Sequence, residues 1–150
     1  MATVRHATPD DADDLYALAQ EFIAFAPHGM FAEFTEEELR AQVNVCIASA
    51  LVLVAEDDGK VVGMLVGLLS GLWFAPSTVM AAELAWWVTP SARGGTAGIR
   101  LVTAFQDWAR EKGARIVTMS SLHLDHDTRV SSVLERMGFS PSEHTYIKRL

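Results

Sequence analysis

The chain of 150 residues is poor in cysteine and in positive charge. Its single cysteine, Cys46, cannot form an internal disulfide, so nothing indicates an oxidising compartment and we expect a cytoplasmic location. Lysine and arginine number 12 against 19 aspartates and glutamates, which gives a formal net charge of −7. Nonspecific nucleic-acid binding needs a basic surface that displaces counterions from phosphates, so this balance argues against DNA and RNA as partners.

The sequence also lacks a recognisable targeting segment. Residues 1–6 contain no basic stretch followed by an apolar one, so no signal peptide is expected. Residues 61–82 carry no charge over 22 positions, the length of a membrane-spanning helix. This run contains three glycines and a proline and follows the turn sequence Asp57-Asp58-Gly59-Lys60, so buried strands explain it better and no membrane partner is expected.

The composition is typical of one globular domain. Half of the residues (50%) are hydrophobic and 21% are charged, with no internal repeat, linker or low-complexity tract. A chain of this length buries roughly two thirds of the surface that its unfolded form exposes, so it needs neither a disulfide nor a structural metal. We therefore expect a single domain over residues 1–150.

Two helix starts can be identified. Thr8-Pro9-Asp10-Asp11 combines a hydroxyl cap, a proline and carboxylates, and Thr35 forms a capping box with Glu38. With the spacing of the apolar residues, these signals predict the order β-α-α-β-β-β-α-β-α-β, a mixed, mainly antiparallel α/β (α+β) sheet with helices on both faces. The expected strands cover residues 3–6, 51–56, 61–69, 82–88, 115–121 and 144–150. The expected helices run from residue 8 to about 24, from 35 onward, from about 96 to 112, and from 127 to 137.

The most informative segment joins a predicted strand to the longest predicted helix. It reads Val88-Thr89-Pro90-Ser91-Ala92-Arg93-Gly94-Gly95-Thr96-Ala97-Gly98. The first N–H groups of a helix have no intrahelical partner, glycines let a ligand approach the backbone, and Arg93 adds a positive charge. The segment therefore suits a diphosphate, although a tight structural turn is the alternative. Neither G-x-x-x-x-G-K-[ST] nor G-x-G-x-x-G is present, so ATP and NAD are not indicated.

This segment resembles the acetyl-CoA-binding motif of the GCN5-related N-acetyltransferases (GNAT family), written [QR]-x-x-G-x-[GA]. Arg93 and Gly98 match the first and last places, whereas Thr96 stands where the family has glycine. That departure either costs little, because the Thr96 N–H is still available, or weakens cofactor binding. Leu134-Glu135-Arg136-Met137-Gly138-Phe139 also resembles the Y-E-K-L-G-F helix ending of the family, and the element order matches over nearly the whole chain.

The resemblance implies acetyl-CoA as acyl donor, bound where two neighbouring strands splay apart. The pantetheine arm would pair with the backbone of the strand end, and the pyrophosphate would lie on the amides of the glycine-rich loop. The residues implied in cofactor binding are Trp86, Trp87, Val88, Arg93, Gly94, Gly95, Thr96, Ala97 and Gly98, with Asp127 and Ser131 as further contacts.

Transfer to an amine requires a group that takes a proton, because at pH 7 only about one part in a few thousand of a lysine-like amine is uncharged. Glu83, between apolar neighbours on the strand that leads to the site, is our candidate for the general base; the alternative is a solvated carboxylate on an outward face. The family commonly has a tyrosine as general acid where this chain has Leu134. Either Tyr146 protonates the thiolate or the thiolate leaves unaided, since a thiol pKa is only about 8.5.

The sequence says less about where the acceptor amine binds. The resemblance places it at the connection between the first two helices, Phe25 to Phe34, although core packing or a dimer contact explains these apolar residues as well. A small-molecule or peptidyl amine is the expected acceptor, and net negative charge favours cationic ones. Residues 123–127, His-Leu-Asp-His-Asp, fit a polar loop before a capped helix better than a metal cluster, and no metal is expected.

We therefore predict an N-acetyltransferase that transfers an acetyl group from acetyl-CoA to a primary amine by direct attack in a ternary complex. A noncatalytic acyl-CoA-binding or regulatory module of the same fold is the alternative, because of Thr96 and the missing tyrosine. A nucleotide-dependent transferase is a third candidate. The sequence leaves homodimer formation open.

Overall fold

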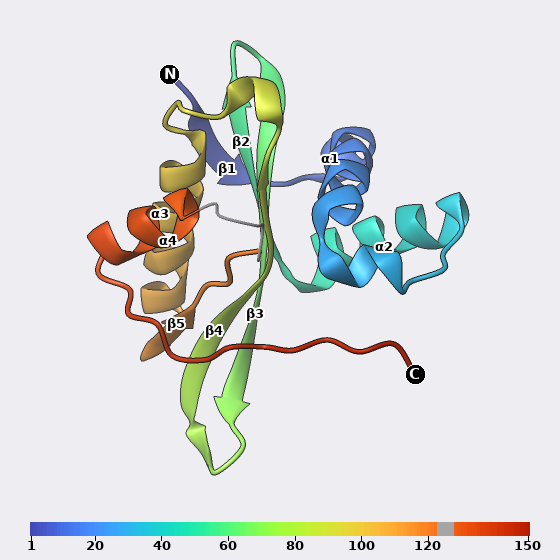
Figure 1. Cartoon of the computed structure of the whole chain (residues 1–150). Coiled ribbons are helices and arrows are strands. Elements are labelled where there is room, and N and C mark those ends of the chain that lie inside the picture. The colour runs from blue at the N-terminus through green and yellow to red at the C-terminus, as the bar shows by residue number, and fades with distance from the viewer. Residues whose placement is uncertain (123–127) are drawn as a thin grey trace.

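A computed structural model describes residues 1–122 and 128–150. It contains one five-stranded sheet in the order β1-β2-β3-β4-β5, with helices on both faces (Figure 1). The strands are β1 (Thr3–His6), β2 (Leu51–Asp57), β3 (Lys60–Leu72), β4 (Ala75–Val88) and β5 (Ile116–Thr118). The helices are α1 (Ala12–Phe25), α2 (Glu36–Ser49), α3 (Ala97–Glu111) and α4 (Arg129–Arg136), with short 3-10 turns at Pro9–Asp11, Pro27–Met30 and Pro90–Ala92.

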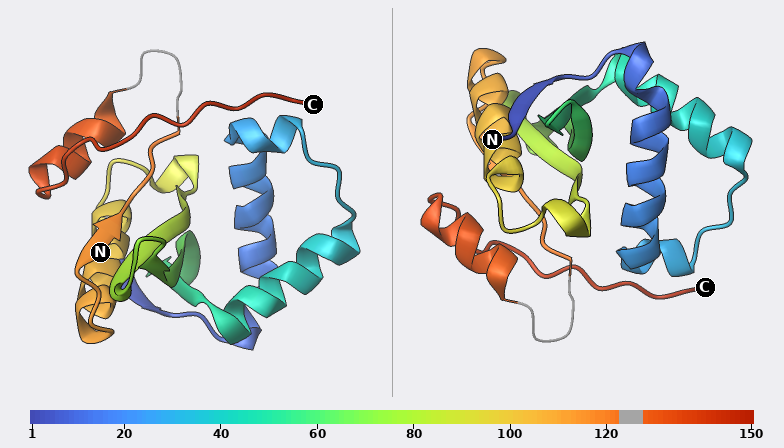
Figure 2. Two further views of the ribbon diagram at one scale, coloured as in Figure 1. Left: turned by 90° about the horizontal axis from the view of Figure 1, so that it is seen from below. Right: turned by 90° about the horizontal axis from the view of Figure 1, so that it is seen from above.

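The predicted mixed, mainly antiparallel sheet is confirmed. Neighbouring strands from β1 to β4 are antiparallel, and only β5 runs parallel to its neighbour β4. Viewed along the sheet, α1 and α2 lie on one side and α3 and α4 on the other (Figure 2). No helix in the described ranges is long and apolar enough to cross a membrane.

The predicted helix starts are present. The Thr35 hydroxyl accepts a hydrogen bond from the Glu38 N–H (3.1 Å), and the Glu38 carboxylate accepts one from the Thr35 N–H (2.9 Å). At the first helix the Asp11 carboxylate accepts from the Thr8 N–H (2.7 Å) and pairs with the Arg5 guanidinium of β1 (2.8 Å). The pair with Arg5 is the main reason why the pKa of the buried Asp11 falls to about 2, so Asp11 joins the first helix to the sheet as a carboxylate.

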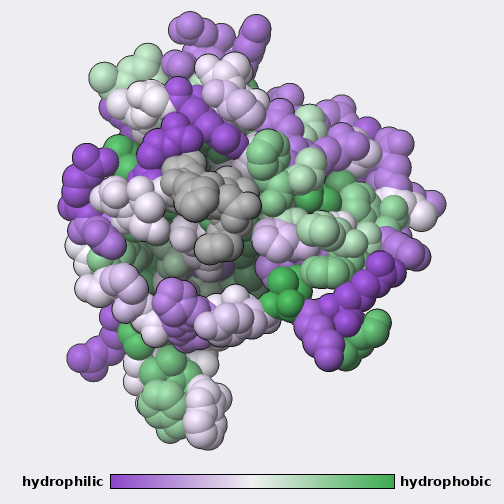
Figure 3. All heavy atoms as spheres, in the orientation of Figure 1, coloured by the Kyte–Doolittle hydropathy of each residue, from purple (hydrophilic) through white to green (hydrophobic). Residues whose placement is uncertain are grey.

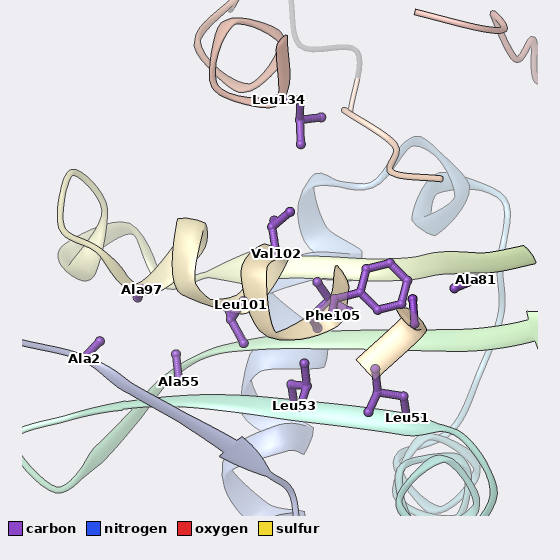
Figure 4. Packing of buried hydrophobic residues seen from close by; sticks show 12 residues of the cluster. Ala2, Leu51, Leu53, Ala55, Ala81, Ala97, Leu101, Val102, Phe105 and Leu134 are labelled. Atoms are coloured by element: carbon purple, nitrogen blue, oxygen red, sulfur yellow. The ribbon is translucent and has the colours of Figure 1, made fainter. Parts of the chain in front are cut away.

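The core consists of two apolar layers, one on each face of the sheet. The layer under α3 centres on Phe105, Leu101 and Val102, which are completely buried (Figure 4). The layer under α1 centres on Val54 and includes Trp87 from β4. Alternate residues of the central strands thus point to opposite layers, as the pleat requires.

The predicted last strand over residues 144–150 is wrong. Residues 139–150 form no strand, and Tyr146 is 91% exposed. An alternating sequence becomes a strand only where a neighbouring strand pairs with its backbone and one face is buried, and this segment has neither. The predicted strand at 115–121 is also shorter than expected, whereas β3 and β4 extend beyond the predicted 61–69 and 82–88 into a long hairpin.

Gly67 sets the distance between β3 and α3. A Cβ atom at Gly67 would lie 2.7 Å from the Phe105 ring, which is completely buried and cannot move aside. Gly67 also pairs with Glu83 across the β3–β4 ladder. The absence of a side chain therefore fixes the strand segment that carries the candidate base.

We predict that Gly67→Ala lowers the free energy of unfolding by roughly 1–3 kcal/mol, because overpacking a closed core costs that much. Urea denaturation followed by circular dichroism measures it. Gly95→Ala is the matched control, since its nearest contact would be an ordinary 3.6 Å and its stability should change little. Equal stability of both variants would contradict this account of the packing.

Candidate active site

The candidate site begins where β5 leaves β4. The two strands are paired only from Met80–Ala82 to Ile116–Thr118. Beyond this point β4 continues to Val88 with β3 on one side, and no strand from residues 1–122 or 128–150 pairs with its other side. The peptide groups of β4 that face away from β3 are therefore open to a strand-like ligand.

The orientation of the last peptide groups of β4 follows from one hydrogen bond. The Thr89 N–H donates to the Val62 carbonyl of β3 (2.9 Å). Peptide groups alternate in direction along an antiparallel strand, so the N–H and C=O of Val88 face the open edge. The Val88 N–H is thus a donor that points into the gap between the two strands.

Glu83 lies at the start of this open edge. The β3–β4 register shifts between Val66 and Gly67, which leaves Leu84 as an extra residue next to Glu83. One Glu83 carboxylate oxygen accepts a hydrogen bond from the Ser120 N–H (2.9 Å), just beyond β5. Burial raises the pKa of Glu83 to about 7 although this bond favours the charged form, so the carboxyl can exchange a proton near neutral pH.

The glycine-rich loop forms the other end of the site. Gly94 has φ +87°, in the region that favours glycine, and α3 begins three residues later. The first backbone bond of the helix is from the Arg100 N–H to the Thr96 carbonyl (3.0 Å). Within the described ranges the N–H groups of residues 94–98 have no backbone acceptor, and Gly94 to Thr96 are exposed. The loop also borders a hollow of about 260 Å³ that Met1, Ala2 and Asp57 help to line.

Arg93 lies against aromatic rings. Its Nε donates to the Val88 carbonyl (2.9 Å), and its guanidinium carbon lies 4.4 Å from the Trp87 ring centroid and 6.0 Å from that of Phe25. The Arg93 guanidinium therefore already uses the Val88 carbonyl, which faces the open edge, as its hydrogen-bond acceptor. Its charge lies between the loop and α1.

Trp86 and Trp87 face opposite layers, as the alternation predicts. The Trp87 indole N–H donates to Glu21 of α1 (2.8 Å), and its ring contacts Phe25 at 5.1 Å between centroids. The Trp86 ring packs into the α3 layer close to Gly98, and its indole N–H is buried with no partner among the residues that the structure describes. An unsatisfied buried donor costs about 1–3 kcal/mol, so this N–H beside the loop fits a ligand that supplies an acceptor.

The structure gathers most of the predicted site residues but not all of them. Glu83, the β4 edge and the loop lie along one open border of the sheet. Ser131 is exposed in the first turn of α4, and Asp127 lies outside the described residues, as does the rest of 123–127. Leu134 is buried in the α3 layer, and Tyr146 lies on the exposed C-terminal segment with no described contact to Glu83.

Glu21 was missed in the sequence. Its two carboxylate oxygens accept from the Trp87 indole and from the Thr89 hydroxyl (3.1 Å), so it joins α1 to the end of β4. In the sequence, a glutamate near the end of a helix is typical of a solvated surface residue, and no pattern distinguishes Glu21 from such a residue. Its partners Trp87 and Thr89 lie 66 and 68 positions further along the chain, so only the folded structure reveals these contacts.

The side of α1 and α2 is apolar. A cavity of about 200 Å³ lies between these helices and the sheet, and Leu84 and Ala85, which follow Glu83, help to line it. Phe25, Met30, Phe31 and Phe34 are exposed at the connection between the helices. Among the described residues, the lining of this cavity includes no charged side chain.

Solved structures share this fold over the whole chain. The aminoglycoside acetyltransferase AAC(6')-Iy, in complex with the bisubstrate analog CoA-S-monomethyl-acetylneamine, has a TM-score of 0.78 at 16% identity, covering 100% of this chain and 98% of that one. A putative acetyltransferase from Agrobacterium tumefaciens has a TM-score of 0.77 at 23% identity, covering 99% of both chains. At these identities the likeness establishes the fold alone.

The sequence itself matches acetyltransferases. The uncharacterized N-acetyltransferase YhfO of Bacillus subtilis (strain 168) is 26% identical over 140 residues, which are 91% of this chain and 88% of YhfO. The family model of the acetyltransferase (GNAT) domain matches residues 2–140. With nearly its whole length matched, this chain belongs to the GNAT acetyltransferase family.

Proposed function

We propose that this protein transfers an acetyl group from acetyl-CoA to a primary amine by direct attack in a ternary complex. The observation that carries the proposal is Glu83, whose pKa is about 7 and which begins the open edge of β4. Acetyl-CoA would supply a thioester whose carbonyl carbon accepts the amine. The new bond is C–N, the bond that breaks is C–S, and the amine proton passes to a base.

The chain offers the groups that such a donor needs. In the segment Trp86 to Val88, the peptide groups of Trp86 and Val88 face away from β3 and suit the amides of a pantetheine arm, and the N–H groups of residues 94–98 suit a diphosphate. The buried Trp86 indole N–H supplies a further donor, and Arg93 is close enough to the loop to add charge once its side chain leaves Val88. We propose Ser131 and Asp127 as additional contacts.

Glu83 is the proposed general base. An amine acceptor is mostly protonated at pH 7, and a carboxylate with a pKa of about 7 is a much better proton acceptor than one near 4.5. The Val88 N–H, which faces the open edge, is proposed to stabilise the negative charge that develops on the carbonyl oxygen. With Leu134 buried and apolar, the thiolate leaves unaided in this scheme, and Tyr146 is the alternative acid only if the C-terminal segment moves toward Glu83.

The proposed acceptor is a small-molecule or peptidyl amine. AAC(6')-Iy, an aminoglycoside N-acetyltransferase with the same fold, binds the bisubstrate analog CoA-S-monomethyl-acetylneamine, which supports an amine as acceptor here. The cytoplasm is the proposed location. A noncatalytic acyl-CoA-binding module remains the second proposal, favoured by Thr96 at the place of a family glycine and by Leu134 at the place of the tyrosine.

We predict that Glu83→Gln lowers kcat/KM at pH 7 by about 10²–10⁴-fold, because the amide keeps the shape but takes no proton. Thiol release from acetyl-CoA across a panel of amines measures it. The affinity for CoA, followed by calorimetry, should stay the same, which separates catalysis from binding. Activity equal to that of the wild type would exclude Glu83 as the base, and CoA binding without thiol release from any amine would favour the noncatalytic module.

The same group predicts a pH dependence. Glu83 acts as a carboxylate, so activity should fall as pH decreases through about 7, where the carboxyl becomes protonated. The wild-type kcat/KM should rise with pH toward about 8, whereas Glu83→Gln should follow only the deprotonation of the amine at higher pH. A weakly basic amine acceptor isolates the contribution of Glu83, and identical profiles for the two proteins would contradict its role.

A third prediction concerns the loop. Gly95→Asp places a carboxylate among the open amides, where it competes with a diphosphate while still suiting the start of a helix. We expect CoA affinity to fall by about tenfold or more, corresponding to roughly 1.4 kcal/mol, with thermal stability retained. Gly95→Asn, which is neutral and of the same shape, is the matched control. Equal CoA affinities of the two variants and the wild type would show that the diphosphate lies elsewhere.

A thermal-shift titration of the wild type separates the remaining candidate. Stabilisation by ATP but not by acetyl-CoA would favour the nucleotide-dependent transferase.

A further inference from the structure

The hairpin of β3 and β4 extends beyond the rest of the sheet. Pairing between β2 and β3 ends at Leu51 and Gly67, and pairing between β4 and β5 begins at Met80 and Ile116. Residues 68–78 therefore form a two-stranded ribbon that projects from the molecule in Figure 1, and no strand in the described part of the chain pairs with either of its edges. A two-stranded ribbon is at best marginally stable in water on its own.

This ribbon presents large apolar side chains to the surface. Trp73 is 90% exposed and Phe74 68% exposed, and their rings contact each other at 5.4 Å between centroids. Leu68 and Leu69 are also exposed, and the projecting end of the ribbon is pale green on one side and pale purple on the other in Figure 3, with no strongly hydrophilic colour. Contiguous apolar groups of this kind mark a contact surface in a folded protein.

The charge distribution decides which partner fits. Residues 61–82 include no charged side chain, so every one of the 31 charged residues (12 + 19) lies elsewhere in the chain. A membrane or a nucleic acid attracts proteins through basic residues, and this ribbon has none while the chain as a whole carries −7. Two copies of an acidic chain repel each other except where a surface is uncharged, and the ribbon is such a surface.

We propose that the ribbon of residues 68–78 is the contact through which two copies of this chain form a two-fold dimer. The ribbons of the two copies pack together, and Trp73 and Phe74 of each copy become buried between them. Buried aromatic side chains cover about 150–250 Å² each, so the two supply roughly 300–500 Å² of the about 800 Å² that each partner buries in a stable interface. Leu68 and Leu69, which are successive residues of β3 on opposite faces of the ribbon, add further exposed apolar surface.

A second copy is also the one apolar partner that is present wherever the chain is present. Burial of the exposed Trp73 and Phe74 rings would favour this contact, and most soluble oligomers are symmetric assemblies of identical chains. This inference does not depend on acetyl transfer, because the ribbon lies outside the open edge of β4 that carries the proposed chemistry.

Sedimentation velocity of the intact chain tests the proposal. The wild type should sediment at twice the 16.4 kDa mass of the chain at micromolar concentration. The double variant Trp73→Glu/Phe74→Glu places charges opposite their own copies across the two-fold axis, so it should sediment as a monomer with an unchanged circular dichroism spectrum. Leu150→Glu is the matched control, since it changes an exposed apolar residue on the C-terminal segment and should remain dimeric.

A second variant keeps the test decisive if the double variant does not fold. Trp73→Ala adds no charge at a position that is 90% exposed, and it should weaken self-association by at least tenfold. A wild type that stays monomeric up to about 100 μM, or a dimer that survives Trp73→Ala unchanged, overturns the proposal. Flotation of a monomeric wild type with phosphatidylcholine vesicles would assign the ribbon to a lipid surface instead.

Discussion

The separation of β5 from β4 is the constraint on which the site depends. Three residue pairs, from Met80–Ile116 to Ala82–Thr118, hold the two strands together, and from Glu83 onward no strand of the part that the structure describes pairs with this edge of β4. Unpaired peptide groups are costly in an interior but useful at a binding site, because they accept a ligand that completes the ladder. The same separation leaves Glu83 partly buried against Ser120, and this burial raises its pKa.

The surrounding packing keeps this edge open and in place. Gly67 lets β3 and β4 lie against Phe105 of α3, and Glu21 of α1 fixes the far end of β4 through Trp87 and Thr89. Both contacts act on the strand from outside the candidate site. The rigid part of the fold thus determines where Glu83 and the Val88 N–H lie, while Gly94 to Thr96 of the loop remain exposed for a ligand.

Much of this arrangement was predictable from the sequence, because local signals determine it. The capping box at Thr35, the turn at Asp58 and Gly59, and the glycine-rich start of α3 each depend on neighbouring residues. The predicted strand at 144–150 failed because alternation records the tendency to form a strand but not whether a partner strand is near. Glu21 and the contact of Gly67 with Phe105 depend on residues far apart in the chain, so no local pattern reveals them. The exposed ribbon likewise could not be distinguished from a buried hairpin, since both have uncharged, apolar strands.

The central claim is that the backbone amides at the start of α3 hold a diphosphate and so direct a thioester toward Glu83. The most direct measurement is the ¹H–¹⁵N spectrum of the labelled protein during titration with CoA, with pantetheine, which has no diphosphate, as the comparison. The account predicts that the amide signals of Gly94, Gly95 and Gly98 move downfield and saturate together with CoA, and move little with pantetheine. Tight binding of CoA that leaves these three signals in place would contradict it.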